Sequence, residues 1–255
     1  MAVTSAPLPS SAVRRLVDYV LDGQTGTPFA DELTAWATRS PRFRAFAKAS
    51  RDKIRKKLRG AKDDDARLDV RAELRAAMLL LTDRRIELAF EAYGSVRGGP
   101  DFTVAFKGER PFNIEATRMR RTADATGFGG ILLAKLRQLP PSVPNVLLVA
   151  IDGDRADAAP VGDAVQALRR RADRNDRDFF ADRGFHGTRG FYERFHRLGA
   201  VVVACEAAVG GDRVAAWTNA SARIPVPDPA LRSCLRAFRV GEPEPLGRAS
   251  VPDSD

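Results

Sequence analysis

The chain has 255 residues, of which 44% are hydrophobic, so it can fold around a full core. Lysine and arginine number 42 against 33 acidic residues. The resulting net charge of +9 favours a polyanionic partner such as nucleic acid, although an arginine-rich coding bias would give the same charge. No stretch approaches the roughly 18 apolar residues of a membrane span, and the N-terminus lacks the order of a secretory signal. The two cysteines, Cys205 and Cys234, fit a reducing compartment, so we expect a cytoplasmic protein without membrane contact.

Residues 1–62 predict a helical, basic N-terminal extension. Ser40 is followed by proline, the arrangement of a helix start, and Gly60 ends the same apolar stripe, so one continuous helix is predicted between them. We expect residues 63–240 to form the main α/β core. The tail, 241–255, is rich in proline and acidic residues and is predicted to be disordered.

The pattern after the extension predicts a mixed sheet. Three consecutive strands should pair antiparallel, and a helical crossover should bring the next strand in parallel. The predicted elements are a helix at 70–81, a strand at 86–93, two strands within 99–121, a flexible turn in "TGFGG" (126–130), a helix at 131–139, a buried strand at 145–151, a helix at 160–180, a buried strand at 199–206, an edge strand at 213–219 and a helix at 228–238. The predicted fold class is therefore α/β, with a mixed β-sheet flanked by helices.

Two carboxylates are predicted on one face of the hairpin within 99–121. The even-numbered residues of both strands are apolar, so burying them together places Asp101 either opposite Glu115, at about 5 Å, or one diagonal step away, at about 7–8 Å. Paired oxygen ligands suit Mg²⁺, Mn²⁺ or Ca²⁺, and Glu73 of the preceding helix lies where it would reach them. The alternative is that Asp101 is a turn residue and Glu115 pairs with an arginine at 118, 120 or 121.

The order of elements from 68 to 151 resembles the PD-(D/E)XK nuclease superfamily, with its αβββαβ restriction-endonuclease-like core. The resemblance is carried by that order, by the glutamate in "VRAELRAAMLLL", and by "GPDFTV" and "FNIEATR". It implies that Asp101 and Glu115 are metal ligands, that Ala116 offers its backbone carbonyl, and that Glu73 is an accessory catalytic acid. The chain departs from the superfamily at the lysine position, two residues after Glu115, which is Thr117.

The missing lysine is predicted to be Lys135, with Lys107 second. Lys135 belongs to the helix that follows the Glu115 strand, and Gln138 would lie one turn further on, where it could position water. Lys107 lies at the hairpin turn, roughly 20 Å along the strand from Asp101, too far for a side chain to reach. The alternative is that Lys135 is an ordinary surface lysine.

A basic segment, "RDKIRKKLR" (51–59), is a candidate for binding phosphates, with a solvated helix face as the alternative. His186 and His196 are more simply explained as surface residues. These features favour a Mg²⁺-dependent or Mn²⁺-dependent endonuclease acting on DNA, and they leave a homodimer open. The alternatives are a non-catalytic nucleic-acid-binding protein on a decayed nuclease fold, and a protein-interaction scaffold. The predicted nucleic-acid-binding residues are Lys53, Arg55, Lys56, Lys57 and Arg59.

Overall fold

The computed structural model describes residues 9–94, 99–119, 123–152, 156–205 and 214–240. The predicted disordered tail and the arginines at 120 and 121 lie outside these residues. The strands are β1 (Ile86–Phe90), β2 (Phe102–Phe106), β3 (Phe112–Arg118), β4 (Asn145–Ile151), β5 (Leu198–Cys205) and β6 (Val214–Thr218). The helices are α1 (Ser11–Val20), α2 (Pro28–Arg39), α3 (Pro41–Ala49), α4 (Arg51–Gly60), α5 (Asp64–Leu80), α6 (Ala125–Lys135), the 3₁₀ helix η1 (Leu136–Gln138), α7 (Ala159–Asp173), α8 (Arg177–Ala181), α9 (Gly187–Phe195) and α10 (Asp228–Val240). No helix in the described ranges has the length and apolar character needed to cross a membrane.

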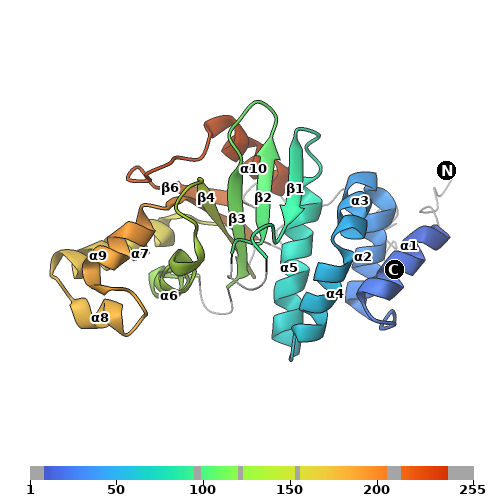
Figure 1. The fold of residues 1–255 in the computed structure, drawn as a ribbon, viewed down its shortest axis with the longest axis horizontal. Coiled ribbons are helices and arrows are strands. Elements are labelled where there is room, and N and C mark those ends of the chain that lie inside the picture. The colour runs from blue at the N-terminus through green and yellow to red at the C-terminus, as the bar shows by residue number, and fades with distance from the viewer. Residues whose placement is uncertain (1–8, 95–98, 120–122, 153–155, 206–213, 241–255) are drawn as a thin grey trace, which may run out of the picture.

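The strands form one mixed sheet in the order β1-β2-β3-β4-β5-β6 (Figure 1). β1, β2 and β3 pair antiparallel, whereas β4 is parallel to both β3 and β5. β6 pairs antiparallel with β5 and lies at the edge of the sheet, as predicted. The predicted mixed α/β class is therefore confirmed, and α6 provides the crossover between β3 and β4.

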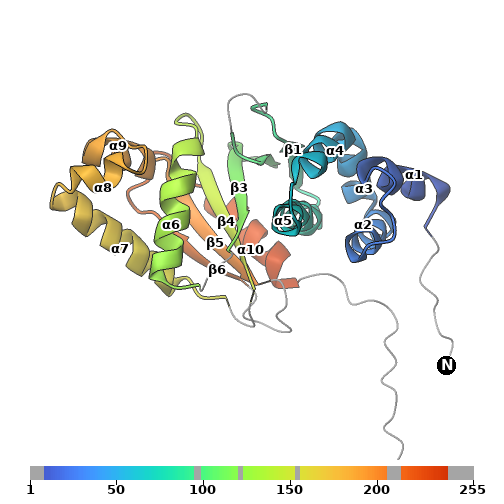
Figure 2. The ribbon, with the colours of Figure 1, turned by 90° about the horizontal axis from the view of Figure 1, so that it is seen from below.

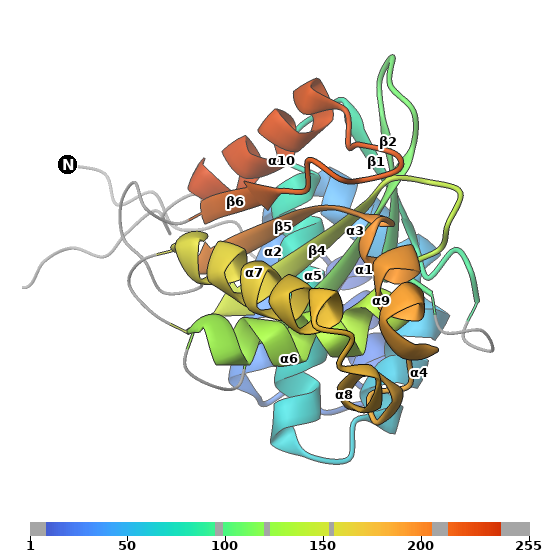
Figure 3. The ribbon, with the colours of Figure 1, turned by 90° about the vertical axis from the view of Figure 1, so that its left-hand side faces the viewer.

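Helices cover both faces of the sheet (Figures 2 and 3). Even-numbered side chains such as Val104, Ile114 and Val202 form one hydrophobic cluster with α5, α10 and the N-terminal helices. Odd-numbered side chains of β4 and β5, such as Val149 and Val203, pack with α6, α7 and α9. Because both faces of β4 and β5 are buried, these strands are apolar at nearly every position.

Aromatic rings link the N-terminal helices to the sheet. The rings of Trp36 in α2 and Phe43 in α3 lie 5.9 Å apart, edge to face. Phe46 of α3 lies 6.0 Å from Phe90 and 6.3 Å from Phe102. All five belong to the hydrophobic cluster that includes α5, so residues 1–62 contribute helices that share their core with the sheet.

Two long helices of the prediction are each broken in two. The helix expected between Ser40 and Gly60 is interrupted at Ser50, which separates α3 from α4. Serine favours helix ends over helix interiors because its hydroxyl competes for backbone hydrogen bonds. The helix expected at 160–180 is interrupted at Asn175, whose φ of 58° is left-handed. Asparagine tolerates that conformation better than most residues.

The prediction of a flexible turn at 126–130 is wrong, because these residues form the first turns of α6. The carboxylate of Asp124 accepts a hydrogen bond from the Gly127 N–H at 2.8 Å and thereby caps the helix. Phe128 is buried in the cluster on this face of the sheet. Capping and burial together outweigh the cost of glycine in a helix, about 1 kcal/mol per residue.

The β2–β3 hairpin has one of the two predicted registers. Phe102 pairs with Ile114, so continuing the register places Asp101 opposite Glu115. The turn contains Gly108 at a φ of 85°, a conformation that favours glycine. The hairpin therefore buries its even-numbered face in the core and leaves the two carboxylates together on the other face.

Candidate active site

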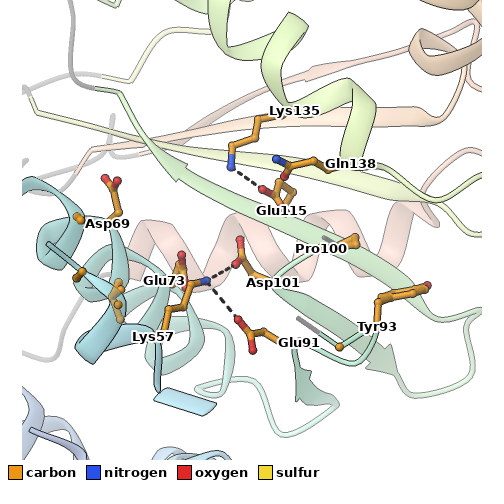
Figure 4. Close-up of a pocket in the computed structure, with 16 residues that line it drawn as sticks. Lys57, Asp69, Glu73, Glu91, Tyr93, Pro100, Asp101, Glu115, Lys135 and Gln138 are labelled. Carbon is orange, nitrogen blue, oxygen red and sulfur yellow. Dashed lines mark hydrogen bonds and ion pairs between the residues drawn. The ribbon is translucent and has the colours of Figure 1, made fainter. Parts of the chain in front are cut away.

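A cavity of about 440 Å³ lies between α4, α5, the hairpin and α6 (Figure 4). Carboxylates and lysines dominate its polar lining. The four residues predicted to be catalytic, Glu73, Asp101, Glu115 and Lys135, all line it, together with Lys57, Asp69, Glu91, Tyr93 and Gln138. The cavity therefore collects side chains from segments about 80 residues apart in the sequence.

Asp101 is fixed by the backbone on both sides of it. Gly99 precedes it where a Cβ atom would lie only 2.6 Å from the Cβ of Tyr93, so a larger residue would not fit. The Asp101 carbonyl accepts a hydrogen bond from the Glu91 N–H at 2.7 Å. Its carboxylate Oδ2 accepts a hydrogen bond from the Ala116 N–H at 2.9 Å. The carboxylate is therefore held against β3, where the hairpin pairing with β2 has ended.

The Ala116 carbonyl points toward the same side as Asp101. In an extended strand, the N–H and C=O of one residue face the same neighbour. Because the Ala116 N–H donates to Asp101, its carbonyl faces the same end of β2. This is the direction expected if Ala116 offers its carbonyl as a ligand, as the family resemblance implies.

Glu115 and Lys135 form a partly buried ion pair between β3 and α6. Lys135 Nζ donates to Glu115 Oε1 at 2.6 Å, and the Glu115 side chain is 4% exposed. The second oxygen, Oε2, is buried and accepts no hydrogen bond from the described residues. The alternative of a Glu115–arginine pair is not seen for Arg118, which contacts Asp65, Asp69 and Asp152. Lys107 lies exposed at the turn.

Glu73 reaches the cavity from α5 and meets Lys57 of α4. Lys57 Nζ donates to Glu73 Oε2 at 2.5 Å and to Asp101 Oδ1 at 2.7 Å. Glu73 is buried, as is Asp101. The ammonium group of Lys57 therefore joins the carboxylate of Glu73 to that of Asp101 (Figure 4).

Burial and crowding of charge shift several pKa values. Burial and then the nearby charge of Asp101 raise the pKa of Glu115, Lys135 partly offsets both effects, and the resulting pKa is about 7. Burial and then the charge of Asp101 also raise the pKa of Glu73 well above its usual value, against the effect of Lys57. Burial lowers the pKa of Lys57, but the charges of Asp101 and Glu73 outweigh it and leave the pKa raised. Glu73 and Glu115 therefore hold a proton more tightly than exposed glutamates do.

The other predicted nucleic-acid-binding residues of α4 face different surroundings. Lys53 donates to the backbone carbonyls of Phe90 and Glu91 at 2.7 and 3.1 Å. Arg55 and Arg59 both pair with Asp22 in the segment after α1, and Lys56 is exposed. Binding of nucleic acid by these residues stays a prediction.

Lys57 lines the cavity, although its place in a basic segment did not indicate this. A helical wheel of α4 puts Ile54 and Leu58 at its centre and sets Lys53 and Lys57, four residues apart, along one border. Both border lysines point to the end of β1 and the carboxylates, where Lys53 donates to backbone carbonyls and Lys57 to Glu73 and Asp101. Glu91, whose Oε1 lies 3.8 Å from Lys57 Nζ, was missed as well, because it follows the strand at a turn.

The donor set of the cavity fits a hard divalent cation. Carboxylate and carbonyl oxygens are the ligands that Mg²⁺ and Mn²⁺ prefer, and Glu115 Oε2 is a buried acceptor without a hydrogen bond. Within the described residues, no group of three or more His, Cys, Asp or Glu side chains is arranged to hold a metal ion as it stands. In the cavity, lysine ammonium groups hold oxygens of Glu73, Asp101 and Glu115.

Comparisons of the chain with protein-family models, with curated proteins and with solved structures find no match.

Proposed function

We propose that the protein is a Mg²⁺-dependent or Mn²⁺-dependent nuclease that hydrolyses phosphodiester bonds in DNA, on a restriction-endonuclease-like fold. The observation that carries the proposal is one cavity in which Glu73, Asp101 and Glu115 meet Lys135. The αβββαβ order of α5, β1–β3, α6 and β4 supports it. The net charge of +9 favours a polyanionic substrate.

Asp101, Glu115 and the carbonyl of Ala116 would hold the metal ion. Asp101 is held in place by the Ala116 N–H, and Glu115 has a buried oxygen that accepts no hydrogen bond from the part of the chain that the structure describes. When bound, the metal would polarise the scissile phosphate and promote ionisation of the attacking water. Glu73 would assist from α5 as the accessory acid.

Lys135 would take the role of the lysine that the superfamily has at the position of Thr117. Its ammonium group is anchored on Glu115 and directed into the cavity, so it would lie beside a phosphate bound there. A compact positive charge at that place stabilises the negative charge that develops on the phosphate oxygens in the transition state. Gln138, which also lines the cavity, would position water.

Cleavage of supercoiled and linear duplex DNA with Mg²⁺, with Mn²⁺ and with EDTA tests this function. Wild type should cleave only with a metal, and Asp101→Asn and Glu115→Gln should each lose at least about 100-fold in rate, as expected when charge stabilisation is removed. Metal-dependent cleavage that persists in both variants would place the activity elsewhere, and no cleavage by wild type would reject the nuclease.

The second candidate is a non-catalytic nucleic-acid-binding protein on the same fold. The observation that favours it is Lys57, which neutralises Glu73 and Asp101 without any metal. Salt-dependent DNA binding by wild type with no cleavage under any metal condition would support this candidate. Absence of both binding and cleavage would favour a protein-interaction scaffold.

A further inference from the structure

Lys57 occupies a position that a bound metal ion would have to share. Its Nζ lies 2.5 Å from Glu73 Oε2 and 2.7 Å from Asp101 Oδ1. Asp101 is a proposed metal ligand, and Glu73 is the proposed accessory acid. A monovalent ammonium and a divalent cation on the same carboxylates repel each other strongly in a partly buried site. The two cations should therefore compete.

A second partner for the displaced ammonium is already present. Glu91 Oε1 lies 3.8 Å from Lys57 Nζ, outside hydrogen-bond distance, and its side chain is 25% exposed. The Lys57 side chain is 27% exposed and has a flexible four-carbon stem, so a short swing brings it to Glu91. The ring of Phe90, 5.4 Å from Nζ, lies beside it.

The backbone around Glu91 is held in an uncommon conformation. Glu91 has a φ of 44°, which is unfavourable for a residue with a side chain. The turn is fixed by the hydrogen bond of its N–H to Asp101 and by Lys53, which donates to its carbonyl. Glu91 is thus fixed beside the carboxylates, while Lys57, one helical turn after Lys53, is free to change partner.

We propose that Lys57 is a built-in counter-ion that holds Glu73 and Asp101 together in the metal-free protein and is displaced toward Glu91 when a divalent cation binds. This inference rests on the proposed metal site. It gives α4 a role in controlling metal affinity, which differs from binding nucleic acid.

The test is calorimetric titration of Mn²⁺ into metal-free wild type and Lys57→Met, which keeps the length of the side chain and removes its charge. Lys57→Met should bind Mn²⁺ at least ten-fold more tightly, and it should melt at a lower temperature than wild type in EDTA because Glu73 and Asp101 lose their counter-ion. Lys56→Met is the matched control, since it removes an exposed lysine of the same helix that does not line the cavity, and it should keep the wild-type affinity.

Glu91→Gln in the wild-type background provides an arm that does not need Lys57→Met to fold, and unchanged Mn²⁺ affinity there would overturn the displacement. It should weaken Mn²⁺ binding in the wild-type background, because the displaced Lys57 ammonium loses its partner. It should have no effect in the Lys57→Met background, where that ammonium group is absent. Equal weakening in both backgrounds would overturn the displacement.

Equal or weaker Mn²⁺ affinity in Lys57→Met would also overturn the displacement. If Glu115→Ala still loses the metal in that case, the proposed metal site survives the failure. No Mn²⁺ binding by wild type or by Lys57→Met would overturn both.

Discussion

Lys135 Nζ donates a hydrogen bond to Glu115 Oε1 at 2.6 Å, although the two residues are 20 positions apart and belong to a helix and a strand. Thr117 lies on the same strand face as Glu115, two residues further along β3, and is half-buried. A lysine at 117 and the lysine at 135 would therefore both reach Glu115. This equivalence makes the lysine assignment testable by relocation.

Moving the lysine should move the activity with it. Lys135→Ala should reduce cleavage at least about 100-fold, because the cation beside the phosphate is lost. Adding Thr117→Lys to Lys135→Ala should restore a large part of the rate, as measured under single-turnover conditions. Arg137→Ala, an exposed cation in the adjacent η1, is the control and should remain active. Full activity of Lys135→Ala would show that a group other than Lys135 stabilises the charge on the phosphate.

Metal binding should depend on the hairpin carboxylates. Wild type should bind one Mn²⁺ in calorimetry, and Glu115→Ala should bind none at the same concentrations. Because the metal needs deprotonated ligands and the pKa of Glu115 is about 7, binding at pH 6 should release protons, seen as a heat that varies with buffer ionisation enthalpy. Glu87→Ala removes an exposed carboxylate of β1 and should not change the titration. Equal heats for wild type and Glu115→Ala would contradict the site.

The metal-free protein should lose stability as the pH rises from about 4.5 to about 7. The pKa of Glu115 is about 7 in the folded protein against an ordinary 4.5, so between these values the folded state binds a proton that the unfolded state releases. At about 1.4 kcal/mol per pKa unit, the loss is on the order of 3 kcal/mol. Denaturant unfolding in EDTA at pH 5 and pH 8 measures it.

Glu115→Gln is the reference for this measurement, since it cannot titrate at that position. Between pH 5 and pH 8, wild type should therefore lose more unfolding free energy than Glu115→Gln does. A constant difference would mean that Glu115 has the same proton affinity folded and unfolded.

Exposed cations of α4 should contribute to the salt dependence of DNA binding. The triple variant Arg51→Ala, Lys56→Ala, Arg59→Ala removes three positive charges from exposed positions of α4. Each lost phosphate contact should lower the slope of log K against log salt by about 0.9 on duplex DNA. A triple variant of exposed residues at the end of α7, Arg169→Ala and Arg170→Ala in the helix and Arg174→Ala at its C-cap, changes the net charge equally on another part of the molecule. Equal slopes for both variants would leave α4 without a special role.

Alternation was enough to predict the two carboxylates, because burying an apolar face fixes which side chains share the other face. It left two registers open, and the choice between them depended on the turn at Gly108. Lys135 could be placed because a crossover helix must pack beside the strand that precedes it. These parts of the site follow from local pattern and chain connectivity.

Lys57 and Glu91 could not be placed in this way. Their meeting depends on how α4 packs against α5 and the end of β1, which is decided by long-range contacts such as Lys53 with the Phe90 and Glu91 carbonyls. A basic helical segment has the same sequence pattern whether it faces solvent or a cluster of acidic residues. The helix in 126–130 was missed for a similar reason, since burial of Phe128 overrides the local preference of glycine.

The aromatic contacts from Trp36 through Phe43 and Phe46 to Phe102 bear on how the protein folds. Removing α2 and α3 would uncover Phe90 and Phe102, which are 3% and 0% exposed, so the sheet has no closed core of its own without them. Helices and sheet should therefore melt in one cooperative transition, and slowly exchanging amides should be found in α3 as well as in β2. Lys57 is carried by a helix inside that cooperative unit. The backbone of Lys57 therefore stays beside the carboxylates for as long as the protein is folded. Only the end of its side chain can move when a ligand binds.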